Sequence, residues 1–168
     1  LDPAMLFFLN GASNVKGSPN ENYGRELQEL YTAGKGPGSA YSEDDVKAAA
    51  LVLTGHTVHP VTFTYFFDAG KHDATNKEFS SFYGNRVITG YNGPAGASEV
   101  DALLDMIFSQ EEISKHICRK IYRHFIYYKI DNDIEQTIIT PLAQVFRNNN
   151  FDIQPVLATL FKSKHFYD

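Results

Sequence analysis

The segment from Ser42 to Gly55 constrains the fold of this chain most, because one short stretch carries the start, the body and the end of a helix. Ser42 stands three positions before Asp45, which is the spacing of a capping box, and Gly55 suits the left-handed residue that ends a helix. Between these ends, apolar residues recur at helical spacing, at Val46, Ala49, Ala50 and Leu53. We therefore predict an amphipathic helix whose apolar side is covered by other elements.

Helix signals of the same kind recur along most of the chain. Ser18, Pro19 and Glu21 have the spacing of a capping box with proline at the first helical position. Gly34 is expected to end the helix that they begin. Pro141 lacks a backbone donor and must kink or divide its own helix. Further helices are predicted over 98–108, over 109–128, from Asp133 and from Asp152.

The apolar pattern changes to a period of about two between residues 57 and 90. The run from Val61 to Phe67 alternates in this way, which predicts a strand with a hairpin partner at 77–82. Another short strand is predicted at 86–88. The sequence therefore predicts a mainly α fold, with about six helices in an irregular bundle and a small antiparallel β-hairpin insertion at about 57–90. A chain of 168 residues suits one domain, which we expect to span residues 1–168.

Composition narrows the classes of function. The formal net charge of -5 argues against nucleic-acid binding, which depends on cations that neutralise phosphates. No run approaches the ~18 apolar residues that a membrane-spanning helix needs, so we expect no transmembrane segment. The single cysteine, Cys118, lies in an apolar helical pattern and is expected in the core. Because the chain begins with Leu1 rather than Met, we expect the N-terminal part of the same protein to be missing.

The first predicted helix is unusually polar. On a helical wheel, Tyr23, Leu27, Leu30 and Tyr31 form one apolar stripe, while Arg25, Glu21 and Gln28 point away from it. Asn20 and Glu26 fall at the boundary of the stripe. One interpretation is structural, with ion pairs on the surface and hydrogen bonds inside. The other is functional, since a polar group at the core boundary is costly unless it has a partner or a task.

A second group of polar residues follows the predicted strand. His72 and Asp73 are adjacent, Lys77 lies four positions after Asp73, and His56 and His59 lie upstream. A histidine beside a carboxylate can act as a pair of metal ligands, or as a general base with its orienting partner. The structural alternative is a loop histidine that is held by hydrogen bonds.

Several blocks of the sequence resemble one family. They are "DPAM" at 2–5, "NENYGREL" at 20–27, "ELYTAG" at 29–34, "YSEDDVKAAALVLTG" at 41–55, "HD" at 72–73 and the closing "FKSKHFY". In this order they resemble the bacterial family catalogued as domain of unknown function 1800. The resemblance implies the C-terminal part of a longer, mostly helical bacterial protein, and it supplies no activity.

The family pattern can be carried over residue by residue. Four residues depart from it, since the family usually has alanine at Gly24, histidine at Tyr31, tryptophan at His56 and glycine at Thr75. The resemblance also implies that some members are exported or act at the cell envelope. The matching positions are Asn20, Glu21, Asn22, Arg25, Glu26 and Glu29 in the first block, and His72, Asp73 and Lys77 in the second.

These features lead to one leading hypothesis and two alternatives. We expect a binding or accessory module that contacts an unknown small molecule or protein through one patch formed by Asn20 to Glu29 and His72–Asp73. The first alternative is a metal-dependent hydrolase of phosphate or sulfate esters. In that enzyme Glu26 or His72 would be the base, and the candidate ligands of a divalent metal would be His56, His72 and Asp73. The second alternative is a purely structural buried network.

Overall fold

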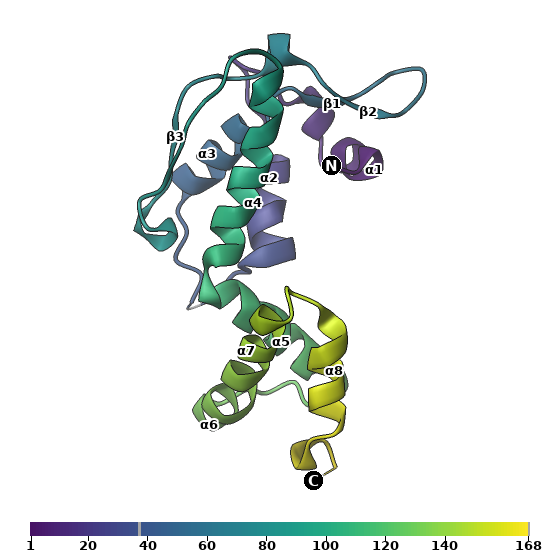
Figure 1. Cartoon of the computed structure of the whole chain (residues 1–168), viewed down its shortest axis with the longest axis vertical. Helices are drawn as coiled ribbons and strands as arrows, with labels where there is room; N and C mark the ends of the chain where they lie inside the picture. Colours follow the sequence, from purple (N-terminus) through teal and green to yellow (C-terminus); the bar gives the residue numbers. More distant parts are fainter. Residues whose placement is uncertain (37, 168) are drawn as a thin grey trace. The chain divides into compact units, whose positions relative to one another are not determined.

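The computed structural model describes residues 1–36 and 38–167, and most of this chain is helical (Figure 1). Its backbone contacts divide the chain into two compact units, Leu1–Ser109 and Gln110–Asp168. The predicted fold class is confirmed, because helices dominate and the strands form small antiparallel pairs. Among the described residues, no helix combines the length and the apolar character that crossing a membrane requires.

The first unit is built around helix α3 (Glu43–Val52), which contacts both α2 (Asn22–Glu26) and α4 (Glu99–Ser109) (Figure 1). A shorter helix, α1 (Pro3–Phe8), precedes them. The core side chains of α3 and α4 are fully or almost fully buried, and they include Val46, Ala49, Leu53, Leu103, Met106 and Ile107. Short 3-10 turns connect the elements of this unit at Gly11–Ser13, Ala69–Lys71, Ser81–Tyr83 and Gly93–Ser98.

The capping box predicted at Ser42 is confirmed. The Ser42 hydroxyl accepts from the Asp45 amide at 3.2 Å, and the Asp45 carboxylate accepts from the Ser42 amide at 2.6 Å. Asp45 is fully buried and also accepts from the amide and hydroxyl of Ser80, each at 2.7 Å. The cap of α3 therefore also fixes a loop that lies 35 residues further along the chain.

The predicted start of the first polar helix is wrong. Helix α2 begins at Asn22 rather than near Pro19, and Ser18 pairs with Val15 in an isolated β-bridge. The amide of Asn20 donates to the Asn14 side chain at 2.9 Å, and the Asn20 side chain accepts from the Asn22 amide at 3.0 Å. Ser18 and Asn20 are thus engaged in local contacts before the helix begins, and the cap signal at Ser18 is not used.

Two small sheets carry the strands of the first unit. Strand β1 (His56–Val58) pairs with β2 (Tyr65–Phe67), and β3 (Lys77–Glu78) pairs with β4 (Val87–Ile88). The strand predicted at 86–88 is thus found, but the predicted pairing of 61–67 with 77–82 is wrong. The chain turns back over 59–64, where the Phe63 amide donates to the His59 carbonyl and Phe63 has a φ of 55°.

The second unit consists of α5 (Glu111–Phe125), α6 (Asn132–Ile134), α7 (Thr140–Asn148) and α8 (Ile153–Phe161), with a π-helical turn at Glu135–Ile139 and a 3-10 turn at Lys164–Phe166. Helix α7 contacts both α5 and α8. Helix α7 begins one residue before Pro141, so the proline stands in the first turn, where its missing donor is tolerated. Cys118 is buried in this core, as predicted, and burial raises the pKa of its thiol to about 12.

Candidate functional site

His72, the first of the predicted site residues, lies in the core of the first unit. Its side chain is 1% exposed. Ring atom Nδ1 lies 2.8 Å from the Thr54 carbonyl oxygen, which can only accept, so Nδ1 carries a proton and donates. The other ring atom, Nε2, lies 3.0 Å from the Glu99 carboxylate. Both nitrogens are therefore already engaged inside the fold.

Glu99 joins His72 to Lys77 in a buried triad (His72, Lys77 and Glu99). Its Oε1 faces His72 and also accepts from the Tyr91 amide at 2.7 Å, while its Oε2 accepts from the Lys77 ammonium at 2.6 Å. The side chains of Lys77 and Glu99 are 0% exposed. Lys77 also donates to the carbonyl of Asp73. Each buried charge thus has an opposite charge and further hydrogen bonds, which is the condition for burying an ion pair.

The sequence did not predict Glu99 as a member of this group. Its only local signal is an acidic residue at the first position of a helix, which is common because the helix dipole favours it there. The pairing with Lys77 brings together residues 22 positions apart, and only the tertiary fold places them side by side.

Gly96 gives the His72 ring its space. A side-chain carbon built on Gly96 would lie 2.5 Å from Cδ2 of His72 and 2.8 Å from its Nε2. These separations are far below ordinary contact, so the glycine lets the backbone of the 93–98 turn pack directly on the ring. The orientation of His72 is consequently fixed both by hydrogen bonds and by packing.

Asp73 is partly buried and points to its own loop. One oxygen accepts from the Thr75 amide at 2.9 Å and also from the Thr75 hydroxyl. Burial alone would raise the pKa of Asp73, but the Thr75 hydrogen bonds and the charge of Lys77 outweigh it and lower the pKa below its usual value. Thr75, which replaces the family glycine, has no positive φ and takes part in this loop through its hydroxyl.

His56 is also buried, and it shares the Phe67 ring as a neighbour with His72. The centre of the Phe67 ring lies 5.0 Å from that of His56 and 5.2 Å from that of His72. Nδ1 of His56 lies 3.0 Å from the Tyr65 hydroxyl, and its Nε2 is buried without a hydrogen-bond partner in the described chain. Burial, followed by the charge of His72, lowers the pKa of His56 to about 4. Among residues 1–36 and 38–167, no three histidine, cysteine, aspartate or glutamate side chains are grouped as metal ligands.

The two asparagines of the polar helix act within the fold. The Asn20 side chain accepts from the Asn22 amide at 3.0 Å, and the Asn22 side chain donates to the Leu9 carbonyl at 3.1 Å. Both residues are partly buried. These bonds join α2 to the end of α1, so Asn20 and Asn22 fix the entry of the polar helix.

The charged residues of the polar helix lie nearer the surface. Arg25 donates two hydrogen bonds to Glu43, at 2.6 and 2.9 Å, and one to Glu21 at 3.1 Å. Glu29 forms an ion pair with Lys35 at 2.6 Å. Glu26 is partly buried, and within the described part of the chain it has neither a hydrogen bond nor an ion pair from its side chain.

The apolar stripe predicted for this helix is correct only at its start. Tyr23 is buried, but Leu30 and Tyr31 are 50% and 45% exposed, whereas Gln28, predicted to face solvent, is fully buried. The reason is the π-helical turn Leu27–Thr32, whose wider hydrogen-bonded ring shifts the phase of the helix. Gln28 accepts from the Tyr83 hydroxyl at 2.8 Å and donates to the Gly24 carbonyl at 3.1 Å.

The two predicted parts of the site have separate partners. Across the described residues, no hydrogen bond or ion pair joins the segment 20–29 to His72 or Asp73. One part is a polar helix with an exposed π-helical turn. The other is a loop fixed by the buried triad.

Comparison with known proteins places the whole chain in one family. No curated protein and no solved structure gives a significant match. The family model described as "Protein of unknown function (DUF1800)" matches residues 1–168. The chain therefore belongs to the DUF1800 family, as its sequence blocks indicated.

Proposed function

We propose that this chain is a binding or accessory module that contacts another protein through the π-helical turn of its first unit. The observation that carries the proposal is the outward position of Leu30 and Tyr31 in the turn Leu27–Thr32, next to the charged helix residues. Turns of π geometry are unfavourable inside an α-helix and recur at functional sites.

The composition of this surface suits a protein partner. Tyrosine is enriched at the centres of protein interfaces, where a polar rim surrounds an apolar contact. Here Leu30 and Tyr31 supply the apolar contact, Arg25 and Glu29 supply the rim, and Glu26 offers a carboxylate without a partner in the described chain. The family resemblance adds the expectation that the partner lies at the cell envelope.

The contacts of the buried triad also support this proposal. A general base must reach the proton that it removes, and a metal ligand needs a free lone pair. His72 offers neither in this arrangement, because Nδ1 donates to Thr54 and Nε2 faces Glu99. In the proposal the triad holds the loop, and binding is left to the polar helix.

Photo-crosslinking in whole cells tests the proposal. The full-length protein would carry a photoreactive amino acid at Tyr31 or, as the control, at Asp105, which is exposed on α4. We expect one protein adduct from position 31 that is absent from position 105 and is weakened by Glu26→Gln. The purified partner should then bind the full-length protein, and Glu26→Gln should weaken that binding.

Enzyme assays distinguish the alternative function. The full-length protein and its Glu26→Gln and His72→Ala variants would be assayed on aryl phosphate and aryl sulfate esters with added divalent metals. We expect no turnover that depends on either residue. Turnover that is lost in Glu26→Gln would contradict the binding proposal and favour the metal-dependent hydrolase.

A further inference from the structure

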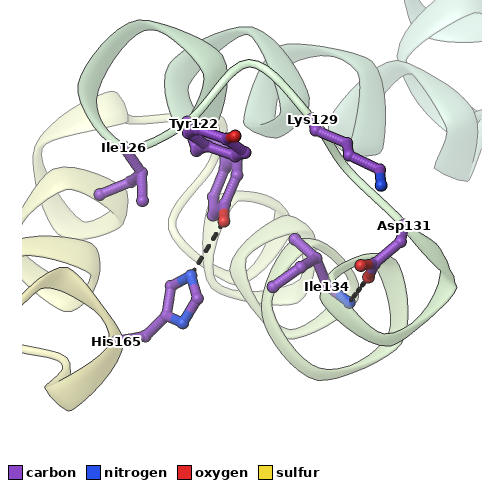
Figure 2. A pocket seen from close by; sticks show the side chains of 7 residues that line it. Tyr122, Ile126, Lys129, Asp131, Ile134 and His165 are labelled. Atoms are coloured by element: carbon purple, nitrogen blue, oxygen red, sulfur yellow. Dashed lines mark hydrogen bonds between the residues drawn. The ribbon is translucent and has the colours of Figure 1, made fainter. Parts of the chain in front are cut away.

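The second unit contains a cavity of about 430 Å³ that the sequence analysis did not anticipate (Figure 2). It lies where the end of α5 and the loop after it meet the turn Lys164–Phe166, which brings His165 to its edge. The volume is within the range of about 300–1,000 Å³ that small-molecule sites occupy. All of the lining residues belong to the second unit.

One side of the cavity is a tyrosine and histidine pair. The Tyr122 hydroxyl lies 2.9 Å from Nε2 of His165, and the two rings lie end to end with centres 5.7 Å apart and planes 22° from parallel (Figure 2). Tyr122 is 2% exposed, and burial, together with the charge of Asp131, raises the pKa of its hydroxyl. The phenol therefore stays neutral and holds His165 in place at neutral pH.

The remaining lining combines apolar side chains with two opposite charges. Ile126, Ile134 and the ring of Tyr127 supply the apolar part. The exposed side chains of Lys129 and Asp131 supply the charges (Figure 2). One oxygen of Asp131 accepts from the Ile134 amide at 3.0 Å and caps α6. Within the described residues, Lys129 and Asp131 form no ion pair with each other or with a third group.

This combination selects for one kind of ligand. A neutral apolar molecule would not use the two charges, and a simple anion or cation would match only one of them. A ligand with both an ammonium and a carboxylate group matches Asp131 and Lys129 at once, while its side chain contacts the isoleucines and Tyr122. Each of these contacts would be a charge-assisted hydrogen bond, which is stronger than a bond between neutral groups.

We propose that this cavity binds a small zwitterion of the α-amino-acid type with an apolar side chain. The ligand carboxylate contacts Lys129, the ligand ammonium contacts Asp131, and Tyr122 with the two isoleucines surrounds the side chain. This proposal does not depend on the π-helical turn Leu27–Thr32, which belongs to the first unit. The proposed protein contact and the proposed ligand site can therefore fail independently.

Calorimetry with three probes tests the assignment of the two charges. Leucine carries both charged groups, leucinamide lacks the carboxylate, and N-acetylleucine lacks the ammonium. The titrations would use the full-length protein at about pH 6.5, where α-amino groups are protonated. We expect saturable binding of leucine, and binding about tenfold weaker or worse for each of the other probes, since each loses one charge-assisted bond.

Two variants make the test specific. Lys129→Gln should weaken leucine binding about tenfold and leave leucinamide binding unchanged, because that probe has no carboxylate for the lysine to contact. Asp131→Asn should weaken leucine binding and leave N-acetylleucine binding unchanged, and asparagine preserves the cap of α6. The matched controls are Lys162→Gln and Asp133→Asn, which change exposed residues of the same unit outside the cavity.

The outcomes are separable. The proposal is overturned if leucine shows no saturable binding, or if the three probes bind equally well to the wild type. It is also overturned if the cavity variants behave like their controls. Circular dichroism of each variant confirms that the helices are intact, so a loss of binding cannot be assigned to unfolding.

Discussion

Replacing Lys77 by Met should destabilise the first unit strongly, because the change leaves the buried Glu99 carboxylate without its nearest cation. The Lys77 and Glu99 side chains are 0% exposed, and their charged atoms are 2.6 Å apart. At an effective dielectric constant of about 20, this separation corresponds to a gross attraction of about 6 kcal/mol. Part of that attraction offsets desolvation of the two charges, and removal of one partner from such a pair costs about 3–5 kcal/mol.

Urea unfolding followed by circular dichroism measures this loss of stability. The matched control is Lys47→Met, because the Lys47 and Asp44 pair has a similar N to O distance, 2.9 Å, but side chains that are 59% and 86% exposed. We expect the control to leave the free energy of unfolding almost unchanged, because solvent screens this exposed pair. A Lys77→Met variant that is no less stable than the control would refute the reasoning.

A double-mutant cycle then isolates the pair. Glu99→Gln alone should also be destabilising, because it leaves the Lys77 ammonium buried with only Asp73 nearby. The double variant Lys77→Met with Glu99→Gln removes both charges, so its cost should be smaller than the sum of the single costs by about 0.5–3 kcal/mol. Additive costs would mean that the two residues do not depend on each other.

Three further predictions concern neighbouring parts of the first unit, each measured as the free energy of unfolding in urea. Tyr83→Phe leaves the buried Gln28 carbonyl oxygen without its donor and should cost about 1–3 kcal/mol. Gly96→Ala places a methyl group against the His72 ring and should cost about 1–3 kcal/mol, whereas Gly36→Ala meets no atom within 4 Å and should cost much less. His56 takes up a proton near pH 6.5 in the unfolded chain but only near pH 4 in the folded one, so acid favours unfolding. As the pH falls from about 6.5 to about 4, the free energy of unfolding of the wild type should decrease by up to about 3 kcal/mol relative to that of His56→Gln. The Gln28 contact would be contradicted if Tyr83→Phe had the same free energy of unfolding as the wild type. The Gly96 contact would be contradicted by equal costs for the two glycine variants. The account of His56 would be contradicted if the difference between wild type and His56→Gln did not change with pH.

Local signals predicted the parts of the fold that depend on neighbouring residues. The capping box at Ser42 and the helix start at Asp152 are satisfied by bonds within a few positions, and the structure has both. Pro141 likewise acts through its own missing donor. The helical class of the fold follows from such signals, because most of the chain carries them.

Features that depend on distant residues could not be predicted. The π-helical turn reverses the expected positions of Gln28 and Tyr31, since its phase is set by packing that a regular helical wheel does not contain. Strand β2 pairs with β1 instead of with residues 77–82, because the chain turns back over 59–64, within the predicted strand. Glu99 carried no distinctive local signal, although it is the centre of the buried triad.

The sequence singled out residues of the candidate site, but it did not predict the contacts that they make in the fold. Asn20, Asn22 and His72 all make specific polar contacts. Their partners are other parts of the fold, however, and only tertiary structure supplies those partners. Glu26 is the predicted residue that stays without a partner in the described chain, which is why the proposed function gives it a contact role.

The central claim is that His72 is closed inside the fold by the buried triad and is not exposed for chemistry. Its rate of modification by diethylpyrocarbonate, followed residue by residue with mass spectrometry on the native full-length protein, tests this claim most directly. His59 and His124 are exposed and serve as internal references. We predict that His72 is modified only when the first unit opens, so it stays protected while both references react, and Lys77→Met removes the protection. Modification of His72 at the rate of His59 in the folded protein would contradict the claim.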